Sequence, residues 1–279
     1  MNKFETALTD ELRNALNALL QLVYEHTGED FRQYKHPTML RRVLRRVEAE
    51  QVDGLDGLLK KASQDRDCLA RLRAALTLHV TSMFRDPSFF LQLREQVVPY
   101  LSTYPHPRIW VAGCSTGQEL FSLRILLEEA GLGERCTLYG TDLSESVLTT
   151  AHSGMVDASL LGDYEANYRA AGGTCRFLDY FEVADGHSRF RPHLLGNAVF
   201  AVHNLVSDMS FNEFHLVSCR NVLMYLDHRA QARAFSMIHE SLTPLGFLAL
   251  GSSESLMNST HQRDYERIDA HEPLFRRMR

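Results

Sequence analysis

The length of 279 residues suits one large domain or two ordinary ones. Hydrophobic residues account for 44% of the chain and charged residues for 23%, which are proportions of a globular protein and not of a disordered one. The formal net charge of −5 argues against a protein that depends on bulk nucleic acid or on an anionic membrane. The N-terminal residues lack the apolar core of a signal peptide, and no run of about 18 apolar residues occurs. We therefore expect a soluble, cytoplasmic protein.

Cysteine and histidine spacing restricts the possible sites further. The five cysteines are odd in number, lie far apart and include no Cys-x-x-Cys pair. This spacing excludes a disulfide scaffold and a zinc ribbon. The histidines show neither His-x-His nor His-x-x-x-His spacing, so we expect no metal site.

The N-terminal part of the chain has the pattern of successive helices. Leucines at helical spacing follow Thr9, a candidate N-cap, and Gly28 stands just past their end. A second helix is expected to open near Pro37, and shorter helices are expected over 55–62 and 68–76. No strand-like run occurs in this part, so we expect an all-helical domain.

After residue 108, short apolar runs alternate with helical stretches. The runs expected to form buried strands are 109–112, 137–139, 199–202, 216–217 and 247–250. The helices expected between several of them are 119–130, 144–152 and 228–242. This alternation predicts βαβ units and a mostly parallel sheet. Only one segment departs from it, because Asp185-Gly186 separates two extended runs and predicts an inserted antiparallel hairpin.

These patterns set the expected domain boundaries. We expect a helical domain over 1–85, a linker helix and loop over 86–107, and an α/β domain over 108–279, with the hairpin segment at about 173–198. The linker helix is expected over 88–101, with prolines stopping it.

Small and acidic residues follow the first two strands, at the edge where open parallel sheets bind ligands. The first strand leads into Gly113-Cys114-Ser115-Thr116-Gly117, whose small residues let a ligand approach the backbone. Asp142 ends the second strand, where a carboxylate suits the hydroxyls of a ribose. Glu119 stands where the pyrophosphate of NAD or FAD would rest, so a cationic ligand such as S-adenosylmethionine fits better. A tight strand-to-helix turn without a ligand is the alternative.

Six segments stand out together, and they are TLHVTSMFRDP (77–87), WVAGCSTGQELFSL (110–123), GTDLS (140–144), HNL (203–205), CRNVLMYLD (219–227) and LGSSESL (250–256). In their order and spacing they resemble the CheR-type chemoreceptor glutamate O-methyltransferases. The resemblance implies an α/β fold, with an all-helical N-terminal domain before a class I S-adenosylmethionine-dependent methyltransferase (Rossmann-like) domain that carries a small antiparallel β-subdomain. It implies the cofactor S-adenosyl-L-methionine, the product S-adenosyl-L-homocysteine, and methyl transfer to glutamates of a chemoreceptor's cytoplasmic helical bundle in signal adaptation.

The resemblance also implies roles for individual residues. The implied cofactor-binding positions are His79, Thr81, Arg85, Gly113, Ser115, Glu119, Asp142, Asn204, Leu205, Cys219, Arg220 and Asn221. Within this set Asp142 is implied at the ribose, Glu119 near the methionyl amino end, and Asn204 with Leu205 at the adenine. The implied catalytic residues are Tyr225, beside the transferring methyl group, and Arg85, which would orient a carboxylate. The sequence departs from the family at His79, where the family often has Asn.

A basic helix indicates the kind of partner. Between Arg32 and Arg46 there are six basic residues and no acid. On a helix, one side is apolar and the opposite side is expected to carry Arg41, Arg42, Arg45 and Arg46. A positive face on an acidic protein favours an acidic protein partner over a merely solvated surface, and the resemblance implies the glutamate-rich bundle of a chemoreceptor. The hairpin over 180–191 is shorter than in family members that capture a receptor's C-terminal peptide, so we expect no such capture.

Two rival functions stay open at this point. One is a class I methyltransferase for a small molecule or RNA, and the other is a regulatory module that binds the cofactor without turnover. The basic helix favours a protein substrate, whereas His79 is the feature that would suit a loss of turnover. A glutamate side chain is already anionic at pH 7, so methyl transfer to it needs no strong general base. We expect a monomer that binds no nucleic acid and does not insert into a membrane.

Overall fold

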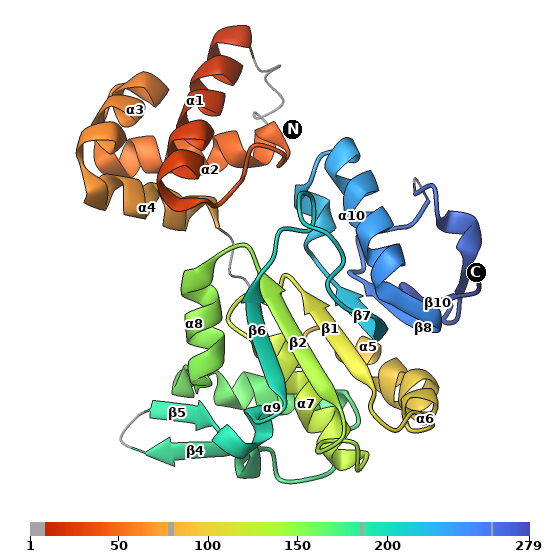
Figure 1. Ribbon diagram of the computed structural model, residues 1–279. Coiled ribbons are helices and arrows are strands. Elements are labelled where there is room, and N and C mark those ends of the chain that lie inside the picture. The colour runs from red at the N-terminus through yellow and green to blue at the C-terminus, as the bar shows by residue number, and fades with distance from the viewer. Residues whose placement is uncertain (1–8, 78–80, 185–186, 258) are drawn as a thin grey trace. The chain divides into compact units, whose positions relative to one another are not determined.

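The computed structural model of the protein describes residues 9–77, 81–184, 187–257 and 259–279 (Figure 1). His79, one of the expected cofactor positions, lies outside these residues. The chain divides into two compact units. The helical unit comprises Met1–Leu78 and Tyr225–Ala230, and the sheet unit comprises His79–Met224 and Gln231–Arg279.

The helical unit is built from α1 (Asp10–Thr27), α2 (His36–Glu50), α3 (Gly54–Gln64) and α4 (Arg66–Leu76). Helix α1 begins and ends where the sequence predicts. The Thr9 hydroxyl accepts a hydrogen bond from the Leu12 N–H at 3.3 Å, and Gly28 takes the left-handed conformation, with φ 74°. The buried stripe of α1 consists of Leu16, Leu19, Leu20 and Val23. The expected all-helical N-terminal domain is confirmed.

Among the described residues of the sheet unit, seven strands form one sheet in the order β6-β2-β1-β7-β8-β10-β9 (Figure 1). The strands are β1 (Arg108–Ala112), β2 (Thr137–Asp142), β6 (Ala198–Val202), β7 (Phe214–Cys219), β8 (Leu242–Leu250), β9 (Tyr265–Arg267) and β10 (Leu274–Arg277). The first five in the sheet order pair in parallel, whereas β10 pairs antiparallel with both β8 and β9. The expected mostly parallel sheet is confirmed. Because β2 and β6 lie on one side of β1 and β7 on the other, the topological switch point falls between β1 and β7.

The helices of the sheet unit follow the predicted alternation with two differences. They are α5 (Pro87–Gln92), α6 (Val98–Leu101), α7 (Gln118–Glu129), α8 (Glu145–Ser153), α9 (Leu161–Ala170) and α10 (His228–Ser241). The expected helix over 88–101 is interrupted by a π-helical turn, Leu93–Val97, next to Pro99, which lacks the N–H that an unbroken α-helix would use. Helix α9 was not predicted, because its buried residues are only three: Leu161, Tyr164 and Tyr168.

A second, smaller sheet confirms the expected antiparallel insertion. Its order is β3-β5-β4, with β3 (Met155–Val156), β4 (Phe181–Ala184) and β5 (His187–Phe190) all paired antiparallel. The Phe190 ring stacks on Phe121 of α7, with ring centroids 4.8 Å apart, which joins the two sheets through one aromatic core. The turn residues Asp185-Gly186 lie outside the described part of the chain.

The segment before α5 packs within the sheet unit. The Phe84 N–H donates to the Ser122 hydroxyl at 2.8 Å, and the Phe84 ring packs against Phe90 and Tyr168. These contacts explain why residues from 81 onward group with the sheet unit, whereas the sequence analysis set its boundary after residue 85. Within the described ranges, no helix is long and apolar enough to cross a lipid bilayer.

Candidate functional site

The loop after β1 turns sharply at the switch point, and packing explains its glycines. Gly113 has φ 74°, and a Cβ there would lie 2.4 Å from Cγ2 of Val222. Gly117 has φ 95°, and its Cβ would lie 2.7 Å from the Phe121 ring. Both positions therefore require glycine whether or not a ligand is present. The case for a ligand rests on the acidic residues around this loop.

Asp142, at the carboxyl end of β2, is held in a fixed orientation. Its Oδ2 accepts the Ser115 N–H at 2.9 Å, and its Oδ1 accepts the Ser144 N–H at 3.2 Å. Each carboxylate oxygen can accept more than one hydrogen bond, so both can still receive a hydroxyl donor. The expected ribose role of Asp142 fits this geometry, since the backbone fixes the carboxylate before any ligand arrives.

Glu119 takes part in a cluster of three charges, which the sequence analysis did not predict. Its Oε2 lies 3.0 Å from Nη1 of Arg220, and Nη2 of Arg220 lies 2.7 Å from Oδ2 of Asp86. The Ser218 hydroxyl donates to Oε1 of Glu119 at 2.6 Å, and the Arg220 guanidinium lies over the Phe89 ring at 3.9 Å. The Arg220 side chain is 1% exposed. Two carboxylates against one guanidinium leave one net negative charge, which suits the ammonium or sulfonium of S-adenosylmethionine.

The loop after β6 is closed by His203, a residue that the sequence analysis did not single out. The His203 N–H donates to the Asp142 carbonyl at 3.1 Å, and its ring Nε2 donates to the Met209 carbonyl at 3.1 Å. Asn204 accepts the Val206 N–H through its Oδ1 at 2.9 Å, which orients the amide and leaves its Nδ2 to donate to an adenine. Leu205 is buried beside it.

The segment after β7 is fixed by Glu254, which lies in the LGSSESL segment but was not named as a site residue. Its carboxylate accepts the N–H groups of Asn221 at 2.9 Å, Met224 at 3.0 Å and Gly251 at 2.8 Å. Glu254 is 9% exposed, and Asn221 has φ 59°. The only sequence signal that Glu254 holds this segment was its position between two serines shortly after a buried strand. Cys219 is wholly buried, and burial raises the pKa of its thiol, so its side chain suits packing and not reaction.

Arg85 lies on a strained turn of the sheet unit. The residues on either side of it, Phe84 and Asp86, have φ values of 50° and 57°. Positive φ at such residues costs about 1 kcal/mol or more each and is concentrated at functional sites. The Arg85 carbonyl accepts Nη2 of Arg220 at 3.3 Å, so the turn is tied to the charge cluster. Thr81 opens this same segment.

Tyr225 groups with the helical unit. Its carbonyl accepts the Lys35 N–H at 2.8 Å, and its ring lies 5.4 Å from the Arg42 guanidinium. Its expected catalytic role stays a prediction.

The expectation that four arginines share the exposed face of α2 is wrong for Arg42. This side chain is 6% exposed and donates to the Leu76 carbonyl, because α2 packs that side against α4. Arg46 pairs with Glu50 at 2.9 Å, an i,i+4 pair just beyond the acid-free segment. Arg41 and Arg45 are exposed as expected.

Both units of the chain match known protein families. Residues 14–77 match the family "CheR methyltransferase, all-alpha domain", and residues 79–271 match "CheR methyltransferase, SAM binding domain". The chain is 38% identical over 262 residues to "Putative methyltransferase Cher3" of Pseudomonas putida KT2440, covering 94% of this chain and 96% of that protein. It is 33% identical over 225 residues to "Chemotaxis protein methyltransferase 1" of Pseudomonas aeruginosa PAO1, covering 76% and 79%. It is 32% identical over 278 residues to an uncharacterized 104.1 kDa protein of Rhodobacter capsulatus, covering 96% of this chain but 28% of that protein.

Proposed function

This chain belongs to the CheR methyltransferase family, with S-adenosyl-L-methionine as its cofactor, and we propose that it methylates glutamate side chains of a chemoreceptor. The products are a glutamate methyl ester on the receptor's cytoplasmic helical bundle and S-adenosyl-L-homocysteine. The names of its relatives, chemotaxis protein methyltransferases, support this substrate class and a cytoplasmic location.

The observation that carries the proposal is the pair of acidic features at the switch point. The backbone-held Asp142 suits the ribose hydroxyls, and the net negative charge around Glu119 and Arg220 suits the cationic methionyl end. We propose Asn204 and Leu205 for the adenine, in the loop that His203 closes. When bound, the cofactor supplies an electrophilic methyl group on a sulfonium sulfur.

The acceptor carboxylate needs positioning and not deprotonation. A glutamate with a pKa near 4.3 is ionised at pH 7, so the protein has to align a carboxylate oxygen with the methyl group and to exclude water. We propose that Arg85 supplies the fork that orients a carboxylate, since the turn that carries it is held by Arg220. Tyr225 is proposed beside the methyl group on the family resemblance alone.

The exposed arginines of α2, Arg41 and Arg45, are proposed to dock on the acidic receptor bundle. Charges of this kind act mainly on the encounter rate and on its salt dependence. Arg42 is removed from the proposed surface, because it is buried against α4. Arg46, which was also expected there, pairs with Glu50 and is only 20% exposed, so it is not counted among the exposed charges.

Incubation with radiolabelled S-adenosylmethionine and receptor-containing membranes tests this function. A carboxyl methyl ester releases volatile label in alkali, whereas methylation of RNA or of a nitrogen atom leaves label that alkali does not release. Cofactor binding without any transferred label would instead support a regulatory module. Base-labile label on a receptor band is the result that we expect.

A further inference from the structure

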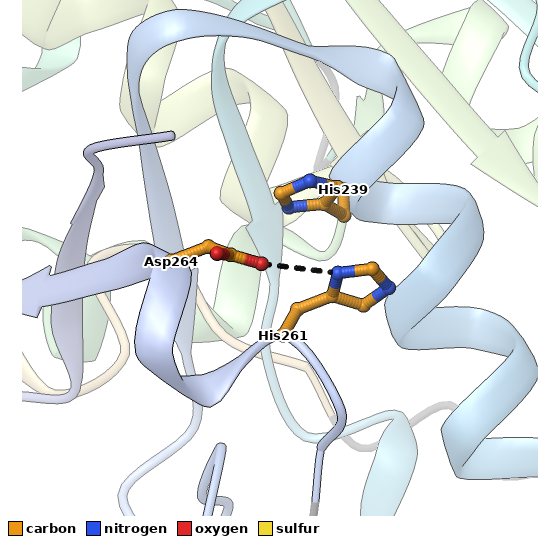
Figure 2. Close-up of side chains that lie close together, drawn as sticks. All are labelled: His239, His261 and Asp264. Atoms are coloured by element: carbon orange, nitrogen blue, oxygen red, sulfur yellow. Dashed lines mark hydrogen bonds and ion pairs between the residues drawn. The ribbon is translucent and has the colours of Figure 1, made fainter.

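Two histidines and an aspartate from two segments of the chain lie together in the sheet unit (Figure 2). His239 comes from the last turn of α10, whereas His261 and Asp264 come from the segment around the 3-10 turn Gln262–Asp264. One ligand atom from each of the three residues lies within 4.8 Å of the others. We propose that these three side chains form a binding site for a zinc ion.

The distance between two of the candidate ligands matches such a site. Nδ1 of His261 lies 3.3 Å from Oδ2 of Asp264. Tetrahedral zinc with bonds of about 2.0–2.1 Å places its ligand atoms about 3.4 Å apart, so the separation of this pair already suits two ligands of one ion. His239 has to approach the other two ligand atoms to complete the set, since the three atoms lie within 4.8 Å of one another, and water supplies the fourth ligand.

Hydroxyl groups hold the other nitrogen of each histidine. Nε2 of His261 lies 3.2 Å from the Ser236 hydroxyl, and Nδ1 of His239 lies 3.3 Å from the Tyr265 hydroxyl. A histidine that binds a metal usually donates its second ring N–H to an oxygen, which fixes the ring and its tautomer. This arrangement leaves Nδ1 of His261 and Nε2 of His239 as the nitrogens that would bind the ion.

The two rings require one local movement. They are stacked, with centroids 4.1 Å apart and planes at 15°, so an ion cannot lie in the plane of both. One ring has to turn out of the stack when the ion binds. The side chains of His261 and Asp264 are 25% and 29% exposed, which gives both the ion and its water access to the site.

The donor set selects the ion. Two imidazole nitrogens and one carboxylate suit zinc and cobalt, whereas magnesium and calcium prefer oxygen ligands alone. Arg277, which donates to the His239 carbonyl at 2.8 Å, places a positive charge nearby that opposes every divalent cation alike, so the donor atoms alone discriminate between the ions. No metal site was expected from the sequence, because the histidines show no His-x-His or His-x-x-x-His spacing and His239 lies far from His261 in the chain.

Cobalt titration of the metal-free full-length protein tests the site. We expect one equivalent of Co²⁺ to give the intense visible absorption of four-coordinate cobalt, and Zn²⁺ to displace it. His239→Gln and His261→Gln should each weaken binding by more than about tenfold. His193→Gln, at an exposed histidine of the same unit, should leave the affinity unchanged and serves as the matched control.

Three results would overturn the proposal: unaltered binding in both ligand variants, a spectrum of six-coordinate cobalt only, or an equal loss in the His193→Gln control. If His239→Gln does not fold, Asp264→Asn replaces it as a variant of a partly exposed side chain. Affinity for S-adenosylhomocysteine is measured in parallel. It should stay unchanged in all variants, so failure of the metal site leaves the proposed methyl transfer untouched.

Discussion

Replacing Asp142 by Asn should weaken binding of S-adenosylhomocysteine by about 1.5–3 kcal/mol, which is the scale of one hydrogen bond to a charged group. This corresponds to a loss of affinity of about ten- to 150-fold. Both carboxylate oxygens face a backbone donor, the Ser115 N–H at 2.9 Å and the Ser144 N–H at 3.2 Å. In either orientation, the amide NH2 of Asn would face one of these donors. The substitution therefore disturbs the loop as well as the ribose contact.

Isothermal titration calorimetry with S-adenosylhomocysteine measures this effect. The matched control is Asp157→Asn in the same unit, since Asp157 also accepts a backbone N–H, from Ser159 at 2.9 Å. We expect the control to bind within about twofold of the unaltered protein. An unchanged affinity in folded Asp142→Asn protein would remove Asp142 from the site and refute the reasoning.

Four further outcomes are expected. Reversal of Arg41 and Arg45 to Glu should abolish receptor methylation at low salt while cofactor affinity stays within about twofold; undiminished methylation would contradict the docking role. Glu254→Gln should weaken the binding of S-adenosylhomocysteine, measured by calorimetry, because the buried carboxylate accepts three N–H groups and an amide in its place cannot accept all three. Unchanged affinity would show that the segment after β7 keeps its conformation without this carboxylate. Hydrogen bonds from Arg71 and Lys61 lower the pKa of Glu50 from its ordinary 4.5 to about 2. The ionised Glu50 therefore stabilises the folded state above about pH 4.5, and this stabilisation is lost as the pH falls toward 2. The melting temperature of Glu50→Gln should therefore change less between pH 5 and about pH 2.5 than that of the unaltered protein. If the melting temperatures of both proteins change equally with pH, ionised Glu50 does not stabilise the fold. C-terminal receptor pentapeptides should not bind in a titration, and micromolar binding would overturn the argument from the short hairpin.

Much of the site's framework could be predicted from near neighbours in the chain. The β-strand runs, the loop from Gly113 to Gly117 and the acid at the end of the second strand all follow from local patterns. Parallel strands bring their carboxyl ends to one edge, so their order along the chain indicated that Asp142 would lie near the loop. The 2.9 Å bond from the Ser115 N–H confirms that placement.

The charge cluster and its supporting carboxylate could not be predicted in the same way. Glu119 and Arg220 were both expected at the cofactor, but nothing in the linear spacing indicates that they pair with each other at 3.0 Å. Glu254 reaches the Asn221 N–H from the loop after β8, whereas Asn221 follows β7, and such a bond depends on the register of β7 and β8. Pairing between distant residues is decided by packing, which local pattern does not encode.

The sequence by itself determined the periodicity of the helices, their caps, the alternation of strands and helices, and the family resemblance. The first three of these features depend on contacts within a few residues, for which side-chain type and spacing are sufficient, whereas the resemblance rests on the order of six segments along the chain. Only the tertiary structure decided which side of α2 is buried, and so withdrew Arg42 from the exposed face. Only the tertiary structure shows that His239 lies next to His261. Contacts between residues far apart in the chain depend on how whole helices and loops pack, and not on the local preference of either residue.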